Sequence, residues 1–249
     1  WKESRITEIK RDIDKMYVIL PFEKKFYEDK HHFPVEFVGH PLIDAIYNQP
    51  IVDPVLFRKE NQLNDKPIIA ILPGSRKQEI TKMLAVMLSV VNDFPDHQFV
   101  IAGAPSQEFS FYQKFITQEN IKFISNKTYD LLRNATAALV TSGTATLETA
   151  LFKVPEVVCY KGSWASYQIA KRIITLKYIS LVNLIMDEEV VTELIQEECN
   201  TKRIREELQK TLKTNDRNTL LEKYALLEEK LGGIGASEKT ATLIVNDLK

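Results

Sequence analysis

The chain has 249 residues, of which 44% are hydrophobic and 27% charged, and its formal net charge is −1 at pH 7. This composition excludes a disordered or fibrous protein and allows one large or two modest hydrophobic cores. The near-zero net charge argues against non-specific nucleic-acid binding, which needs a basic surface.

Segments that would target the chain to a membrane or hold a metal are missing from the sequence. No apolar run approaches the length of about 18 residues that a membrane span requires, and no leader pattern is found. The two cysteines, Cys159 and Cys199, and the four histidines lack metal-ligand spacing. There is no glycine-rich nucleotide fingerprint of the common ATP or dinucleotide type. We therefore expect a cytoplasmic protein with neither a metal nor a cofactor.

Short apolar runs alternate with helical patterns along the chain. Strands are predicted at residues 16–20, 35–38, 68–72, 99–102, 121–124, 137–140 and 157–160. Helices are predicted at 3–14, after Arg76, and at 166–176, 188–196, 201–212 and 219–231, the last ending at Gly232. This alternation is typical of an α/β, Rossmann-like parallel sheet with helices on both faces.

Residues 39–66 interrupt the periodicity with prolines and amide side chains, as a linker between lobes does. Two strands and one charged helix precede this break, and they cannot close a core of their own. The chain also begins at Trp1 rather than at a methionine. We therefore expect residues 1–50 to be a remnant of an N-terminal lobe with its linker. Residues 51–232 are expected to form the main domain, and residues 233–249 a helix that crosses back to the first lobe.

A turn of small residues follows the strand at 137–140 and precedes a helix. Ser142, Gly143 and Thr144 have little side-chain bulk, so an anion can approach the free N–H groups at the helix start. No capping box occupies these groups. Glu148 lies one helical turn beyond Thr144, where its carboxylate can accept hydrogen bonds from a ribose. The segment predicts a nucleoside-diphosphate site, with an ordinary capped helix as the alternative.

The strand at 68–72 runs into a second turn of the same kind, Pro73-Gly74-Ser75-Arg76. Arg76 would place a fixed positive charge beside a phosphate. Because parallel strands end on the same side of a sheet, the two turns can share one ligand. The polar segment that contains Asn126 either faces a base edge or is a plain loop.

Three polar residues, Asn183, Glu193 and Gln196, stand in apolar surroundings near the C-terminal end of the predicted sheet. Half-buried polar groups need partners. They either cap neighbouring helices or reach a ligand, and the sequence leaves both readings open. The pair Asp12 and Asp14 resembles a metal-binding pair, but it stands among basic residues and is predicted to be a salt-bridged surface.

Taken together, these motifs closely resemble the lipid-A-disaccharide synthase family. The resemblance is colinear and covers nearly the whole chain. It rests on Leu72-Pro73-Gly74-Ser75-Arg76 with Glu79, Ser142-Gly143-Thr144-Ala145-Thr146-Leu147-Glu148, and Asn183-Leu184 with Glu193-Leu194-Ile195-Gln196-Glu197. It is extended by Arg11-Asp12-Ile13-Asp14-Lys15-Met16 and Phe37-Val38-Gly39-His40-Pro41-Leu42.

The resemblance implies a two-lobe GT-B glycosyltransferase of lipid A biosynthesis in Gram-negative bacteria. Such an enzyme joins UDP-2,3-diacylglucosamine to 2,3-diacylglucosamine 1-phosphate and releases UDP. It further implies that this chain is the C-terminal, donor-binding lobe with remnants of the first lobe, and that the general base lies upstream. We therefore expect the chain alone to bind the donor without turnover. The acylated substrates imply peripheral contact with the inner membrane, and a homodimer is left open.

The resemblance also assigns site residues. The diphosphate is assigned to Gly74, Ser75 and Arg76, which stabilise the leaving group, and to Ser142, Gly143, Thr144, Ala145 and Thr146. Glu148 is assigned to the ribose, and Asn183 and Gln196 to the donor side or the contact between lobes. Two other functions stay open at this point, a non-hydrolysing UDP-sugar epimerase and a non-catalytic nucleotide-binding module.

Overall fold

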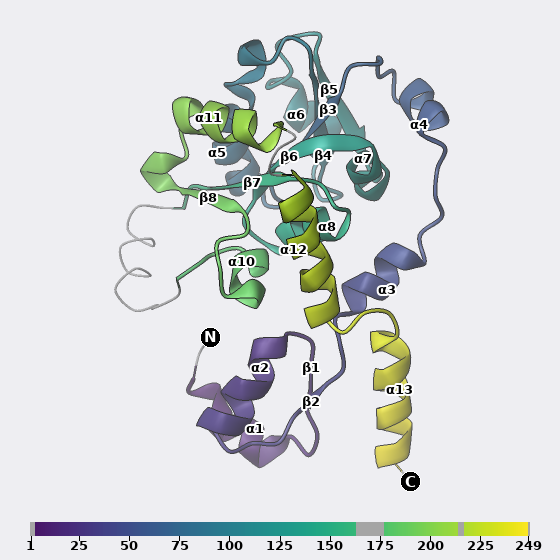
Figure 1. Cartoon of the computed structure of the whole chain (residues 1–249), viewed down its shortest axis with the longest axis vertical. Helices are drawn as coiled ribbons and strands as arrows, with labels where there is room; N and C mark the ends of the chain where they lie inside the picture. The colour runs from purple at the N-terminus through teal and green to yellow at the C-terminus, as the bar shows by residue number, and fades with distance from the viewer. Residues whose placement is uncertain (1–2, 163–176, 214–216, 249) are drawn as a thin grey trace. The chain divides into compact units, whose positions relative to one another are not determined.

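The computed structural model describes residues 3–162, 177–213 and 217–248 (Figure 1). By its internal contacts the chain divides into two compact units. The larger is Pro50–Tyr224, and the smaller joins Trp1–Gln49 to Ala225–Lys249. The predicted helix at 166–176 lies outside the described residues.

The larger unit contains a six-stranded sheet in which every neighbouring pair of strands is parallel. The strand order is β5-β4-β3-β6-β7-β8. Strands β4 and β5 follow β3 on one side of the sheet, and β6, β7 and β8 follow it on the other side. The bounds are β3 (Ile68–Leu72), β4 (Gln98–Gly103), β5 (Ile121–Ser125), β6 (Ala135–Thr141), β7 (Glu156–Tyr160) and β8 (Thr192–Ile195).

Helices cover both faces of this sheet, which confirms the predicted α/β class. On β3, Ile69 and Ile71 enter one core with α5 and α11, whereas Ile68 and Ala70 enter the other with α4 and α7. Because both faces are buried, the strands read as continuous apolar runs. The helices of this unit are α4 (Pro54–Glu60), α5 (Lys77–Leu88), α6 (Phe109–Gln113), α7 (Thr128–Asn134), α8 (Thr144–Leu151), α10 (Leu181–Met186) and α11 (Thr201–Thr211), with the 3-10 turns η2 (Val91–Asp93) and η3 (Gln196–Glu198).

The predicted helix at 188–196 is wrong. Residues Thr192–Ile195 form strand β8, which pairs with β7, and η3 follows it. This apolar segment contains β-branched residues, and only four of its residues enter the sheet, so its sequence pattern alone cannot distinguish a strand from a helix. Pairing with β7, which makes β8 the edge strand of the sheet, is a tertiary interaction and decides the outcome.

The predicted linker at 39–66 contains two short helices, α3 (Pro41–Tyr47) and α4. Each begins with a proline, and proline is favoured at the first helical position because its missing N–H has no intrahelical partner there. The Asp53 side chain caps α4 by accepting hydrogen bonds from the N–H groups of Val55, at 2.9 Å, and Leu56, at 3.0 Å. The prolines therefore start helices in this segment rather than only interrupting structure.

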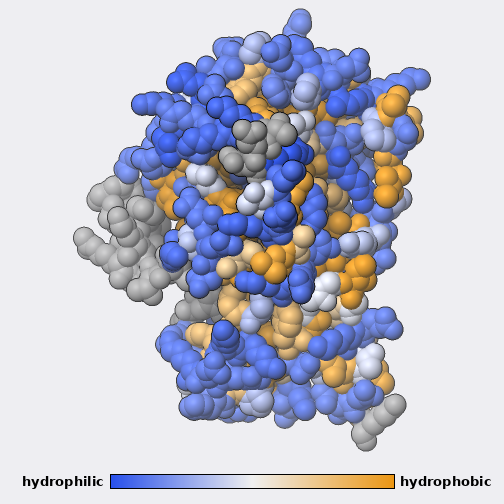
Figure 2. Space-filling view, viewed as in Figure 1, coloured by the Kyte–Doolittle hydropathy of each residue, from blue (hydrophilic) through white to orange (hydrophobic). Residues whose placement is uncertain are grey.

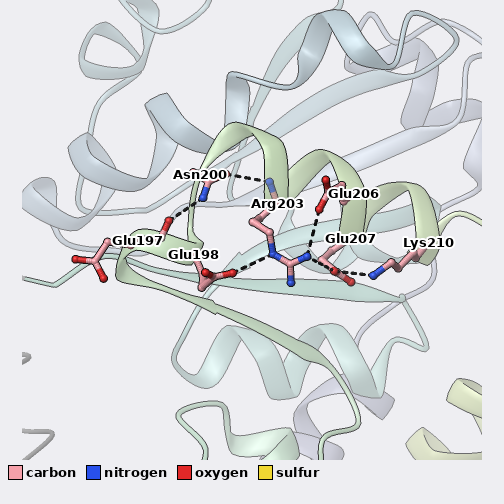
Figure 3. Close-up of polar contacts among 7 residues, drawn as sticks. All are labelled: Glu197, Glu198, Asn200, Arg203, Glu206, Glu207 and Lys210. Carbon is pink, nitrogen blue, oxygen red and sulfur yellow. Dashed lines mark hydrogen bonds and ion pairs between the residues drawn. The ribbon is translucent and has the colours of Figure 1, made fainter.

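Helix α11 carries a network of polar contacts on its first turns (Figure 3). Asn200 caps the helix by accepting a hydrogen bond from the Arg203 N–H at 3.0 Å. The Arg203 guanidinium is 3.0 Å from the Glu198 carboxylate and 3.1 Å from that of Glu207, which also pairs with Lys210. Ile204 and Leu208 meanwhile enter the core. The network thus covers the outer side of a helix whose inner side is apolar.

The smaller unit contains two short parallel strands and several helices. Its core is formed by Val18, Tyr27 and Val35. The elements are α1 (Arg5–Asp12), β1 (Tyr17–Val18), α2 (Pro21–Lys25), the π-helix η1 (Phe26–Lys30), β2 (Glu36–Phe37), α3 and α13 (Ala236–Asp247), and the end of α12 (Arg217–Lys230) also belongs to it. The predicted surface pairing near the N-terminus is confirmed at Asp12, which binds Arg11 at 2.7 Å.

Most of the visible surface is hydrophilic, with hydrophobic side chains gathered over α4 (Figure 2). The exposed apolar residues there are Ile51, Val55 and Leu56, while Phe57 of the same helix is fully buried. Over the described ranges, no helix has the length and hydropathy needed to cross a membrane.

Asp44 of α3 joins α13 to the rest of the smaller unit. Its carboxylate accepts hydrogen bonds from the N–H groups of Gly235, at 2.6 Å, and Ser237, at 2.8 Å. These backbone hydrogen bonds lower the pKa of Asp44. The stabilisation is therefore complete above the unfolded-state pKa of about 3.9 and is lost as the pH falls through the lowered folded-state pKa.

We predict that Asp44→Ala weakens the start of α13 by about 0.5–2 kcal/mol at pH 7, the usual cost of losing a helix cap. Hydrogen exchange of the α13 amides should accelerate accordingly, and the difference from the parent chain should shrink as the pH falls below about 4. Asp65→Ala, at an exposed position, is the matched control. Unchanged α13 exchange at pH 7 would contradict the role of Asp44.

Candidate functional site

The two predicted turns meet at one edge of the sheet. Strands β3 and β6 are neighbours, and each ends in a short turn that leads into a helix, α5 or α8. This is the point where the strand order reverses, the position at which open α/β sheets bind ligands. A cavity of about 510 Å³ lies there, bordered by both turns. Its lining includes Gly74, Ser75, Arg76, Glu79, Gly103, Ala104, Thr128, Thr141, Ser142, Gly143, Thr144, Ala145 and Glu148.

The start of α8 presents free backbone donors to this cavity. Gly143 is the N-cap residue and no side chain caps the helix. Among the described residues, the N–H groups of Gly143, Thr144 and Ala145 have no hydrogen-bond acceptor. A Cβ added to Gly143 would meet nothing within 4 Å, so the space in front of this turn is open. These N–H groups and the helix dipole favour an anion at this position.

The turn after β3 is held in shape by Glu79. Gly74 has a φ of 101°, which favours glycine, and a Cβ there would overlap the Glu79 carboxylate. The Ser75 N–H donates to Glu79 Oε2 at 3.2 Å, and Ser106 Oγ donates to the Ser75 carbonyl oxygen at 2.9 Å. The Ser75 N–H is therefore already used within the protein, and Ser75 serves the shape of the turn.

Arg76 is the N-cap residue of α5, which also lacks a side-chain cap. Its side chain is exposed and borders the cavity. Within the part of the chain that the structure describes, the Arg76 guanidinium has no ion-pair partner. Since none of its N–H donors is hydrogen-bonded to a described residue, they can reach a ligand, and a planar guanidinium matches a phosphate in two-point geometry.

Glu148 lies on the same face of α8 as the free N–H groups and is half-buried. The Tyr129 hydroxyl donates to Glu148 Oε1 at 3.0 Å, which orients the carboxylate. Burial raises the pKa of Glu148 and, together with the nearby carboxylate, raises the pKa of Tyr129 to about 12. The second oxygen, Oε2, has no partner among the described residues and can accept hydrogen bonds from hydroxyl groups.

Two residues of the α8 turn use their side chains inside the protein. Ser142 Oγ donates to the Ile179 carbonyl oxygen at 2.9 Å. Thr146 is fully buried, and its Oγ1 donates to the Gly143 carbonyl oxygen at 2.8 Å. Ser142 borders the cavity whereas Thr146 does not. Their hydroxyls therefore shape the turn, and the ligand-facing groups are the backbone donors.

The Asn183 side chain, which the resemblance assigns to the donor side or the contact between lobes, is fully buried and hydrogen-bonded at both its oxygen and its nitrogen. Its Oδ1 accepts from the N–H groups of Val190 and Val191, and its Nδ2 donates to the Val191 carbonyl oxygen and to Glu193 Oε1. An amide has two donors and one acceptor oxygen, so no hydrogen bond is left for a ligand. In this structure Asn183 positions Glu193.

Glu193 in turn fixes the segment before α10, since its carboxylate accepts from the N–H groups of Ile179 and Ser180, both at 2.9 Å. This is the capping alternative that the sequence left open. Because Ile179 is also the acceptor for Ser142 Oγ, the contacts of Glu193 reach the α8 turn.

Asn126 and Gln196 also lie away from the cavity lining. Asn126 follows β5, two strands from β3, and is exposed. Gln196 follows β8 at a φ of 54°, and its buried Nε2 lacks a hydrogen-bond partner among the described residues. Neither residue is among the described residues that line this cavity.

Sequence reasoning missed several contributions to this site, of which three follow. Gly103 and Ala104 at the end of β4 border the cavity, and Tyr129 orients Glu148. Tyr129 stands on α7, which precedes β6, and only the tertiary fold brings it to α8. In the described ranges, no group of three or more His, Cys, Asp or Glu side chains is arranged to hold a metal ion.

The chain matches known proteins over almost its whole length. The model of the lipid-A-disaccharide synthetase family matches residues 1–243. A lipid-A-disaccharide synthase of Idiomarina loihiensis is 37% identical over 258 residues, which cover 98% of this chain and 65% of that protein. The chain thus spans slightly less than two thirds of the length of this relative.

Solved structures of low sequence identity share the fold. The S. aureus MnaA co-structure with UDP has a TM-score of 0.63 at 16% identity, covering 94% of this chain and 61% of that one. WaaG, described as a glycosyltransferase involved in lipopolysaccharide biosynthesis, has a TM-score of 0.55 at 16% identity, covering 92% and 62%. These matches show that the chain has an α/β, Rossmann-like fold of the kind found in GT-B glycosyltransferases. By its match to the family model, the chain belongs to the lipid-A-disaccharide synthetase family.

Proposed function

We propose that this chain supplies the UDP-sugar-binding part of a glycosyltransferase that makes the lipid A disaccharide. The enzyme would join UDP-2,3-diacylglucosamine to 2,3-diacylglucosamine 1-phosphate and release UDP. One observation carries the proposal: the same cavity, at the switch point between β3 and β6, is bordered by two helix starts without a side-chain cap, a carboxylate, and an arginine that pairs with no described residue. Family membership supports the reaction, and the fold shared with a protein solved with UDP supports the nucleotide.

In this proposal the diphosphate lies against the start of α8. The N–H groups of Gly143, Thr144 and Ala145 donate to its oxygens, and Arg76 approaches from the start of α5. As the acceptor hydroxyl attacks the donor C1, the bond from C1 to the diphosphate oxygen breaks and negative charge grows on UDP. Preorganised donors aimed at such developing charge contribute roughly 3–4 kcal/mol each to lowering the barrier. Gly74 and Ser75 act by keeping Arg76 in place.

The ribose is assigned to Glu148, whose free Oε2 accepts hydrogen bonds from its hydroxyls. Tyr129 keeps the carboxylate turned toward the cavity. The base that removes the acceptor proton is assigned to the part of the relatives that this chain does not span. Since both substrates carry acyl chains, we place the complete enzyme at the inner-membrane surface as a peripheral protein. The direct test is transfer by the full-length protein, with both acylated substrates, read as disaccharide and UDP.

Two rival functions predict different results in the same assay. A UDP-sugar epimerase would convert the sugar nucleotide to an isomer without an acceptor, and a non-catalytic module would leave both substrates unchanged. The family match favours the transferase over both.

We predict that Arg76→Ala weakens UDP binding to this chain about tenfold or more, because hydrogen bonds to charged groups contribute about 1.5–3 kcal/mol. The UDP affinity of Arg76→Lys should lie between those of the parent chain and Arg76→Ala, since lysine keeps the charge but loses the planar two-point contact. Arg205→Ala removes a partly exposed arginine of α11, 3.5 Å from Asp93, and serves as the control. Calorimetry that finds equal UDP affinity for Arg76→Ala and the parent chain removes Arg76 from the site.

We further predict that the UDP affinity of the parent chain falls as the pH is lowered from about 8 to 5. Glu148→Gln should bind UDP more weakly than the parent chain at pH 8, and its UDP affinity should change less with pH. The raised pKa of Glu148 means that it gains a proton at a higher pH than an ordinary glutamate, and the protonated form accepts ribose hydroxyls less well. The ionisation of UDP affects the parent chain and Glu148→Gln equally, so the difference between their pH dependences of UDP affinity reports the protonation of Glu148. Parallel titrations would contradict its assignment to the ribose.

A further inference from the structure

A second cavity of about 340 Å³ adjoins the first one, beside the opening turns of α5. The two cavities share Arg76, Glu79 and Thr141 as lining residues. The second is completed by Lys77 and Lys82 of α5 and by the segment after β7, which includes Lys161. It therefore lies at the same edge of the sheet as the proposed diphosphate position, with Arg76 bordering both.

The lining of the second cavity has an excess of positive charge. Arg76, Lys77, Lys82 and Lys161 face a single acidic residue, Glu79, which already accepts the Ser75 N–H. In the parts of the chain that the structure describes, neither Lys82 nor Lys161 forms an ion pair. Lysines grouped without acidic partners repel one another, and an anion between them relieves that repulsion. A donor diphosphate in the first cavity leaves these lysines without a partner.

Thr141 adds an independent observation. It is the last residue of β6, is only 2% exposed, and borders both cavities. Its Oγ1 has no hydrogen-bond partner among the described residues. A buried hydroxyl without a partner costs free energy, since it has lost its hydrogen bonds to water. A ligand oxygen in the shared wall of the cavities would supply the missing acceptor.

We propose that the second cavity binds the phosphate monoester of the acceptor substrate, beside the donor diphosphate. This inference rests on the proposed function and adds a subsite to it. Lys82 and Lys161 neutralise the phosphate, and the Thr141 hydroxyl donates to one of its oxygens. Arg76 lies between the two anions and reduces their mutual repulsion, so both can be bound at the same time.

The probe is glucosamine 1-phosphate, titrated by calorimetry into this chain already saturated with UDP. The parent chain should bind it without displacing UDP, and Lys82→Ala combined with Lys161→Ala should weaken its binding about tenfold, with a smaller effect on UDP. Lys202→Ala, an exposed lysine of α11, is the matched control and should change neither affinity. Glucosamine without the phosphate should not bind.

Several results overturn the proposal. They are competition between glucosamine 1-phosphate and UDP, equal binding of unphosphorylated glucosamine, or equal affinity of the double variant and the control. If UDP fails to bind while glucosamine 1-phosphate binds and responds to the lysines, the donor assignment fails and the phosphate subsite stands. The two proposals are therefore separated by one set of titrations.

Thr141→Val tests the hydroxyl in a second way. Because the variant removes an unpaired buried hydroxyl, its melting temperature should equal or exceed that of the parent chain. Its affinity for glucosamine 1-phosphate should nevertheless fall several-fold, and Thr141→Ser should retain the affinity. A variant that loses stability but keeps its affinity would show that the hydroxyl serves the fold, and would overturn its role in the subsite.

Discussion

The parallel pairing of β3 with β6 is the interaction on which the rest of this structure depends. It joins two strands that lie more than sixty residues apart in the chain, Ile71 facing Leu139 and Leu72 facing Val140. Because the pair is parallel and in this register, both strands end at the same edge of the sheet. The starts of α5 and α8 then border one cavity. Every property assigned to the site follows from this convergence of two helix starts.

The free donors at the site are held by groups that do not themselves face the ligand. Glu79 fixes the turn after β3, and Tyr129 orients Glu148. Ser142 is tied through Ile179 to Glu193, which Asn183 holds. Such supporting contacts matter because the proposed contacts to the diphosphate are backbone N–H groups, whose direction depends on the turn that carries them. The turn that carries the N–H groups of α8 is therefore held by hydrogen bonds to the segment before α10.

The two cavities at this edge of the sheet differ in the charged groups that line them. The first cavity combines neutral backbone donors with one arginine and one carboxylate, a set suited to a nucleoside diphosphate with its sugar. The second is lined by several cations and an unpaired hydroxyl, a set suited to a smaller, more highly charged group. Arg76 borders both. Under the proposed function, the first set would hold the donor diphosphate and the second the acceptor phosphate.

The sequence by itself determined the sheet class, five of the six strands of the sheet and the positions of the two small-residue turns, because buried strands and such turns leave local patterns at Ile68–Leu72 and around Gly143. Only the tertiary structure decided that residues 192–195 form strand β8, because the sequence pattern predicts a helix there and the pairing with β7 makes them a strand. The tertiary structure also decided the role of Asn183, since a polar residue in an apolar run can bind either a ligand or a neighbouring loop. Its partners, Val191 and Glu193, come within hydrogen-bond distance only because the chain folds back on itself after α10. Tyr129 and the lysines of the second cavity could not be found from spacing, because they come together through the packing of separate helices and strands.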